Sequence, residues 1–398
     1  MLLYLNKKLN FLVYDCEKYL NLLIKLEGKM MDLVKKIEDL IRIKSVTGNI
    51  GEIEKCFSYI VESFKGVDVN IKIERFDDAS PVIYIRNNDE DVQDVLILGH
   101  LDVVDANDDM FEPKIKDGKL YGRGSLDMKS FAVVGLESLR YVIEKGQNVK
   151  FGIILSSDEE KGSKSTDAFL ERYKNIGAKV VLDNDVGGDI GVIINKCKNP
   201  VFVKLRAKGE ACHGSTPWEG LDANEMLMDS LKELRKKYPY FDKNSGKPDN
   251  AWIDTMHVAK IFGGEVSNVV AKNAEALLDF RLVETSSLSD LEKNIKDALK
   301  EGVEYEIVSS STPVVMSEDE PKILTYKKIA EDVLGKEIKF EQIGGATDAR
   351  LFAQRGAIVI MHSGTGEGMH GDNEYVEIDS VYKLFEIQKR YLEAIASK

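Results

Sequence analysis

Continuous apolar runs alternate with helical patterns between residues 31 and 199 of this 398-residue chain. Val95–Leu98, Phe151–Leu155 and Val180–Leu182 are short and uninterrupted, which is typical of strands buried on both faces. Between the first two runs, apolar residues at steps of three and four predict a helix over residues 132–143. This alternation predicts an α/β domain with a mixed, mostly parallel sheet flanked by helices.

The pattern changes after Asn199. Val201, Val203 and Leu205 alternate with polar residues, and the same period returns over residues 276–282, so both segments are predicted to be half-exposed strands. The predicted order is strand–helix–strand–strand–helix–strand, a ferredoxin-like α+β sandwich. The α/β rhythm then resumes, which indicates that the sandwich is inserted into the first domain. We therefore predict an N-terminal helical extension (1–30), an α/β domain (31–199 plus 314–398) and an inserted domain (200–313).

The N-terminal extension is rich in leucine, but charged residues such as Lys7, Asp15 and Glu17 interrupt its apolar stretches. Leucines at steps of three and four predict an amphipathic helix. The lack of an uninterrupted apolar core argues against a signal peptide and against a membrane span. Met31 opens a second, self-contained helical pattern. It is an equally good candidate for the natural start, so residues 1–30 are either native or an extension.

The charge and cysteine content of the chain limit which kinds of partner and location are expected. The formal net charge is −13, from 68 acidic and 55 basic residues, which argues against a nucleic acid or an anionic membrane as the main partner. The four cysteines are scattered without a CxxC pair, so no disulfide framework is predicted and a cytoplasmic location is expected.

Acidic and histidine residues stand where the predicted strands end. The loops beyond the carboxyl ends of strands form the ligand crevice of an open α/β sheet, so these side chains are expected to converge. Any one of them alone is more often structural or solvated; their shared location carries the argument. Imidazole with carboxylate suits zinc, manganese or cobalt, and no cysteine joins the set as in a zinc finger. The set is His100, Asp102, Asp127, Asp158, Glu159, Glu160, Asp183, Asp185 and His370.

Longer motifs follow one another in a fixed order: GHLDVV, FEPKIKDGKLYGRGSLDMKS, SSDEEKGS, KGEACHGSTPWEGLDANE, SNVVAKNAEALLDFRLVE, GGATDAR and MHGDNEYVE. From Met31 to the C-terminus this set resembles the co-catalytic zinc metallopeptidase family. That family includes aminoacylases, acetylornithine deacetylase, succinyl-diaminopimelate desuccinylase and glutamate carboxypeptidase. The resemblance implies two zinc ions, for which cobalt or manganese can substitute. It also implies that the inserted domain is a lid and dimerisation domain, and hence that the protein is a homodimer.

The resemblance also implies the metal ligands. His100 binds one zinc ion, Asp127 bridges both, and Glu160 and His370 bind the second. The remaining ligand is an acidic residue after the strand that ends at Leu182, where the family often has Glu-Pro. This chain reads VVLDNDVGG instead. Asp185 matches the family spacing better and is the preferred ligand, with Asp183 as the alternative.

Three further residues receive catalytic roles from the resemblance. Asp102 orients His100 and raises its basicity, as the hydrogen-bond partner of a ligating histidine does. Glu159 is the general base, which deprotonates a water and passes the proton to the leaving amine. His213, in ACHGSTP, stabilises the oxyanion from a partner subunit. His257 and His362 match no motif and are predicted to be structural.

The substrate residues implied by the resemblance lie in two motifs. Asn268 and Arg281 correspond to the family residues that bind the substrate carboxylate, and an arginine fork suits that group. In GGATDAR, Gly345 permits close backbone approach, Thr347 lines the loop, and Arg350 either holds a second carboxylate or lies on the surface.

The sequence therefore predicts a two-zinc enzyme that removes the acyl group from an N-acyl amino acid. Two alternatives stay open. One is a dipeptidase or carboxypeptidase that acts on short peptides with a free carboxylate. The other is a metal-free relative that only binds its ligand, which the retention of the metal-ligand set disfavours.

Overall fold

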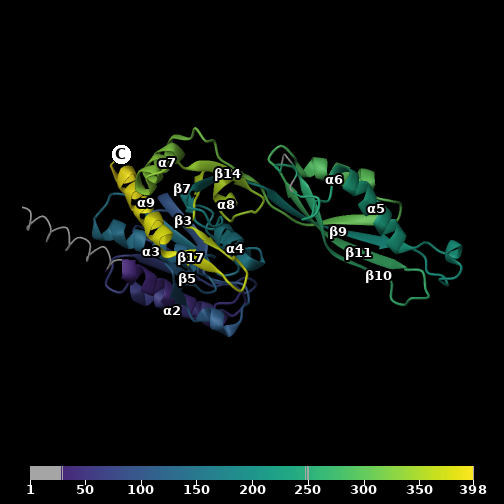
Figure 1. The fold of residues 1–398 in the computed structure, drawn as a ribbon, viewed down its shortest axis with the longest axis horizontal. Coiled ribbons are helices and arrows are strands. Elements are labelled where there is room, and N and C mark those ends of the chain that lie inside the picture. Colours follow the sequence, from purple (N-terminus) through teal and green to yellow (C-terminus); the bar gives the residue numbers. More distant parts are fainter. Residues whose placement is uncertain (1–27, 29, 247, 249–250, 398) are drawn as a thin grey trace, which may run out of the picture. The chain divides into compact units, whose positions relative to one another are not determined.

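The computed structural model describes residues 28, 30–246, 248 and 251–397 (Figure 1). The predicted helix over residues 1–30 therefore lies almost wholly outside the described residues. The described chain forms two compact units. The first contains the residues up to Ile193, Asp319–Lys339 and the chain from Gln354 onward, and the second contains Ile194–Glu318 and Phe340–Ala353.

The first unit is built on a mixed sheet with the strand order β1-β2-β6-β3-β7-β15. The pairs β1/β2 and β2/β6 are antiparallel, whereas β6, β3, β7 and β15 run parallel to one another. The mixed, mostly parallel sheet expected from the sequence is thus confirmed. The strands are β1 (Asn70–Glu74), β2 (Val82–Arg86), β3 (Val92–His100), β6 (Phe151–Ser156), β7 (Gly177–Asp183) and β15 (Ile358–Met361).

Helices pack against this sheet. Gly135 in α3 faces Ile97 of β3 and Ile153 of β6, and a Cβ added there would lie 3.2 Å from the Ile97 side chain. α3 therefore sits close to the two strands whose ends carry acidic and histidine residues. Residues 30–41 are helical as well. The labelled helices of this unit are α2 (Ile50–Ser63), α3 (Lys129–Glu144), α4 (Lys164–Arg172), α7 (Pro321–Leu334) and α9 (Ile378–Ala396) (Figure 1).

Two smaller features complete the first unit. Four short strands form a separate antiparallel sheet in the order β16-β17-β5-β4. Single turns of 3-10 helix are η1 (Asp108–Phe111) and η2 (Glu159–Lys161). The four strands of the small sheet are β4 (Lys114–Lys116), β5 (Lys119–Tyr121), β16 (Gly366–Glu367) and β17 (Tyr375–Glu377).

Among the described residues, no helix has both the length and the apolar character needed to cross a bilayer.

The second unit contains an antiparallel sheet in the order β10-β11-β9-β12. Its elements follow one another as β9–α5–β10–β11–α6–β12, which is the order expected of a ferredoxin-like sandwich. Buried residues alternate along β9 and β11, and they pack with α5 and α6 into one apolar core. The elements are β9 (Asn199–Lys208), α5 (Ala223–Lys237), β10 (Thr255–Gly263), β11 (Asn273–Leu282), α6 (Leu288–Ala298) and β12 (Val303–Ser310).

The boundary of the second unit differs from the one drawn on the sequence. The sequence predicts residues 340–353, which include the GGATDAR loop, in the α/β domain, whereas in the structure they group with the second unit. β14 (Lys339–Ile343) pairs with β8 (Val192–Cys197), most of which groups with the second unit. β8 also pairs antiparallel with β13 (Val314–Val315), which draws residues 314–318 into the same unit. The short helix α8 (Arg350–Ala353) ends this segment.

Candidate metal and catalytic site

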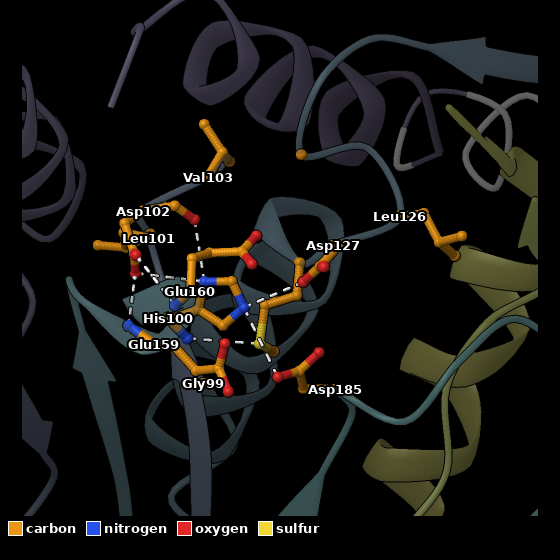
Figure 2. A network of polar contacts seen from close by, with 12 residues as sticks. Gly99, His100, Leu101, Asp102, Val103, Leu126, Asp127, Glu159, Glu160 and Asp185 are labelled. Carbon is orange, nitrogen blue, oxygen red and sulfur yellow. Dashed lines mark hydrogen bonds and ion pairs between the residues drawn. The ribbon is translucent and has the colours of Figure 1, made fainter. Parts of the chain in front are cut away.

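His100 is the last residue of β3 and is fully buried. Its Nδ1 lies 2.9 Å from the backbone oxygen of Asp102 and 3.4 Å from Oδ1 of the same residue. A carbonyl oxygen only accepts, so Nδ1 carries the proton and donates it there. The other ring nitrogen, Nε2, faces Asp127 and Asp185 at 3.0 and 3.6 Å (Figure 2). The β3 end thus presents one imidazole nitrogen to two carboxylates.

Asp127 lies between two histidines. Its Oδ1 is 3.0 Å from Nε2 of His100, and its Oδ2 is 2.9 Å from Nε2 of His370. The residue sits in the loop that leads into α3, and its side chain is almost fully buried. His370 comes from the segment between β16 and β17 and has a φ of +62°, an uncommon backbone conformation for a residue with a side chain. The Asp127 carboxylate therefore places one oxygen beside His100 and the other beside His370.

The potential ligand atoms divide into two groups, and within each group they lie within 4.8 Å of one another. The first group is His100, Glu159 and Asp185; the second is Asp127, Glu160 and His370. Figure 2 shows Glu160, Asp127 and Asp185 gathered around His100. The neighbours Glu159 and Glu160, both in η2, thus belong to different groups.

Asp185 and Asp183 occupy different surroundings. Asp185 contributes to the first group of ligand atoms. Asp183, the last residue of β7, is buried, and its Oδ1 accepts a hydrogen bond of 3.0 Å from the backbone N–H of Asp185. Asp185 therefore lies among the other potential ligand atoms, whereas Asp183 holds the backbone that carries Asp185.

Asp102 is fully buried and accepts hydrogen bonds from three sides. Thr47 donates its hydroxyl at 2.7 Å, and the backbone N–H groups of Glu159 and Glu160 donate at 3.2 and 3.3 Å. Burial raises the pKa of Asp102, but the contact with His100 and these donors outweigh burial and leave the pKa below its ordinary value. Thr47 was not identified from the sequence, because a lone threonine between two helices belongs to no recognisable pattern.

The density of carboxylates in the site shifts several pKa values. Burial, together with the charge of Asp127, raises the pKa of Glu160 to about 7 and raises the pKa of Asp185. Burial also opposes ionisation of Asp127, but hydrogen bonds from His100 and His370 outweigh it and lower its pKa. The hydrogen bond to Asp127 raises the pKa of His370. Carboxylates crowded in this way are typical of sites that bind divalent cations.

The donor set fits a metal. Oε1 of Glu160 is buried without a hydrogen-bond partner, and a metal ion is one way to satisfy such an atom. Imidazole nitrogens and carboxylate oxygens are ligands that zinc uses in catalytic sites. Asp158, by contrast, bonds to the backbone N–H and hydroxyl of Ser165 and holds the start of α4. Asp158 is therefore structural.

The predicted oxyanion and carboxylate residues lie in the second unit. The His213 ring is exposed, and its Nδ1 accepts the backbone N–H of Ser215 at 3.2 Å. The segments of His213 and Asn268 run side by side, because the N–H of Gly214 donates to the backbone oxygen of Asn268 at 2.8 Å. The Arg281 fork contacts both carboxylate oxygens of Asp279, at 2.9 and 3.1 Å.

The GGATDAR loop has its own internal bonds. Arg350 donates to Oδ1 of Asp348 at 2.7 Å and to the backbone oxygen of Thr347 at 3.2 Å. Thr347 is buried and its Oγ1 accepts the N–H of Ala349 at 3.0 Å, so its hydroxyl stabilises the loop. Gly345 has open space around the position of a Cβ, with only the Ile343 side chain near it, at 3.8 Å.

An α/β sheet whose strand ends carry imidazole and carboxylate groups in this arrangement is typical of a metal-dependent hydrolase. Comparison with known proteins identifies the family of hydrolases. Residues 96–394 match the pattern of Peptidase family M20/M25/M40, and the chain belongs to this family of hydrolases that act on amide bonds.

Relatives extend the match over most of the chain. An uncharacterized metallohydrolase of Methanocaldococcus jannaschii is 29% identical, covering 90% of this chain and 98% of the relative. The succinyl-diaminopimelate desuccinylase of Rickettsia akari is 27% identical over 89% of this chain and 98% of its own. Among solved structures, aminopeptidase PepT from Bacillus cereus has a TM-score of 0.75 at 20% identity, covering 93% and 99% of the two chains. The similarity to aminopeptidase PepT shows that the two chains share a fold.

Proposed function

We propose that this protein is a two-zinc amidohydrolase that removes the acyl group from an N-acyl amino acid. The observation that carries the proposal is the position of Asp127, whose two oxygens lie 3.0 and 2.9 Å from the His100 and His370 nitrogens. A carboxylate placed in this way suits a bridge between two metal ions. His100, Asp127 and Asp185 would hold one zinc ion, and Asp127, Glu160 and His370 would hold the other.

When bound, the zinc ions would polarise the scissile carbonyl and lower the pKa of the attacking water. Glu159 then serves as the general base. Its carboxylate takes a proton from the water as the oxygen–carbon bond forms, and it delivers that proton to the nitrogen as the carbon–nitrogen bond breaks. Asp102 is a positioning residue in this scheme, because it accepts the N–H of Glu159 and lies beside Nδ1 of His100.

His213 is proposed to stabilise the oxyanion, and its tautomer supports that role. A backbone N–H can only donate, so the bond from the N–H of Ser215 makes Nδ1 of His213 an acceptor, and the Ser215 hydroxyl, 2.7 Å from Nδ1, then donates to it as well. In the neutral imidazole the proton then resides on Nε2. That N–H is the kind of donor that a developing oxyanion requires.

The substrate is proposed to be an amino acid with an N-acyl group, of the desuccinylase or deacetylase type. Desuccinylases among the relatives support this choice over a peptide. Asn268 and Arg281 would bind the amino-acid carboxylate, and the GGATDAR loop, with Gly345, Thr347 and Arg350, would contact the acyl side. The Asp279 contact occupies two nitrogens of the Arg281 fork and leaves Nη1 for a substrate oxygen.

A substrate panel tests the proposal. N-succinyl and N-acetyl amino acids, succinyl-diaminopimelate and dipeptides are compared with the zinc-loaded protein at one enzyme concentration. The proposal predicts that kcat/KM is highest for an acyl amino acid. A preference for dipeptides would assign the chain to the peptidase alternative, and no hydrolysis of any amide in the panel would contradict both.

We also propose that the protein is a homodimer that pairs through the second unit. β10 is an edge strand of its sheet, and Ile261 and Phe262 on this strand expose 52% and 61% of their surface. An open strand edge with exposed apolar side chains is a surface that pairing with another copy would cover.

A further inference from the structure

Glu374 is a buried carboxylate that holds the loop in front of Asp127. Its Oε1 accepts backbone N–H groups from Gly124, Leu126 and Asp127, at 3.0, 2.9 and 3.1 Å. The residue is 1% exposed. Hydrogen bonds from backbone N–H groups to a buried carboxylate are charge-assisted and strong. The backbone of Asp127 is therefore fixed by the same carboxylate as Gly124 and Leu126 earlier in this loop.

Arg123 connects this loop to the segment that carries His370. Its Nη1 forms an ion pair with Oε2 of Glu374, and its Nη2 donates to the backbone oxygen of Gly371 at 3.3 Å. Gly371 follows His370, whose backbone has the positive φ described above. A residue in such a conformation persists only where its surroundings determine the backbone. The pair thus links the loops of two residues whose side chains meet at 2.9 Å.

We propose that Glu374, paired with Arg123, is a positioning residue for Asp127 and His370 and thereby sets the metal affinity of the second group. The inference rests on the proposed metal site. The group formed by Asp127, Glu160 and His370 draws two of its three residues from these loops. The other proposed site, formed by His100, Asp185 and the shared Asp127, draws only Asp127 from them. The two groups should therefore respond unequally when the pair is disrupted.

The test compares Glu374→Ala with Leu392→Ala. Leu392 is a fully buried residue in α9 of the same unit, so its truncation lowers stability without touching either loop. Metal dissociation constants are measured by chelator competition, and the cobalt-loaded proteins are compared by visible absorption, which reports coordination geometry. For Glu374→Ala we expect one of the two bound metals to weaken by about 10- to 100-fold and the other, which shares only Asp127, to weaken less, with an altered cobalt spectrum. For Leu392→Ala we expect a lower melting temperature with both metals unchanged.

Glu374→Gln covers the case in which the alanine variant does not fold. It keeps an oxygen for the three N–H groups but loses the charge that pairs with Arg123, so the same loss of one metal is expected to a smaller degree. Unchanged metal affinity and spectrum in a folded Glu374 variant would overturn the inference. Equal weakening in Leu392→Ala would also overturn it. Failure of the unaltered protein to bind metal would instead refute the proposed function.

Discussion

Asp102 illustrates how one buried side chain organises several others. It lies beside Nδ1 of His100 and at the same time accepts the N–H groups of Glu159 and Glu160. The imidazole at the end of β3 and the η2 turn are therefore held by one residue, through its backbone oxygen and its carboxylate. Its bond from Thr47 ties both to the segment that precedes α2.

Glu159 is the residue whose role is most sharply testable. Its carboxylate lies with the first group of ligand atoms, so it is placed either as a base or as a ligand. Glu159→Gln keeps the size of the side chain and removes its basicity. We predict that kcat falls by about 10²- to 10⁴-fold while the zinc content stays the same. A loss of one zinc ion, measured by elemental analysis, would show that Glu159 is a ligand instead, and full activity would contradict the mechanism.

His362 gives a pH prediction. It is fully buried, accepts the Tyr326 hydroxyl at Nδ1 and donates from Nε2 to the backbone oxygen of Ile190. Burial lowers its pKa from 6.5 to about 4. Below pH 6.5 the unfolded chain binds a proton that the native protein does not, so stability is full above that pH and declines towards pH 4. The decline contributed by His362 is expected to be about 3 kcal/mol.

The measurement is the difference in unfolding free energy between the unaltered protein and His362→Gln, from pH 7.5 to pH 4. Titration of the metal-site carboxylates is common to both proteins and cancels. The gap between the two proteins should shrink as the pH falls. A gap that stays constant with pH would contradict the assignment of a neutral buried histidine.

At the scale of elements, α3 connects the two sides of the site. It begins two residues after Asp127, and its Gly135 packs on Ile97 of β3, the strand that ends at His100. A helix that approaches a strand this closely has no room for a branched side chain. The packing of Gly135 thus helps to set the distance between Asp127, just before α3, and His100, at the end of β3.

Gly135→Val should therefore destabilise the protein, by about 1–3 kcal/mol, because overpacking displaces α3 from the sheet. Valine at Glu144, an exposed position at the end of the same helix, is the matched control for the lower helix propensity of valine. Thermal unfolding of both variants provides the comparison. Equal melting temperatures would show that the α3–β3 contact tolerates the added volume.

The sequence predicted the strand ends well, because parallel strands bring their carboxyl ends to one edge wherever they lie in the chain. His100, Glu160 and Asp185 could be placed together on that ground. The supporting bonds could not be predicted. Arg123 and Glu374 are 251 residues apart, and their pairing depends on how the Asp127 and His370 loops meet, which no local pattern records. The pairing of β14, which precedes the GGATDAR loop, with β8 is equally non-local.

At the scale of the whole molecule, the proposed dimer depends on the edge of the second unit's sheet. Phe262→Glu places a charge on the exposed β10 strand, so we predict that it converts a dimer into a monomer, as measured by light scattering. Phe262 is 61% exposed, so the fold itself should be unaffected. Glutamate at Val308, a 51% exposed residue of the opposite edge strand β12, is the control and should leave the dimer intact. A monomeric unaltered protein with full activity would remove the role proposed for His213 in a partner subunit.

The central claim is that the two groups joined by Asp127 hold zinc for amide hydrolysis. The most direct test is to remove all metal with a chelator and then titrate zinc while following hydrolysis of an N-succinyl amino acid. We predict no activity without metal and a rise that saturates at two zinc ions per chain. Activity that persists in the metal-free protein, or two bound zinc ions without hydrolysis of any acyl amino acid, would contradict the account.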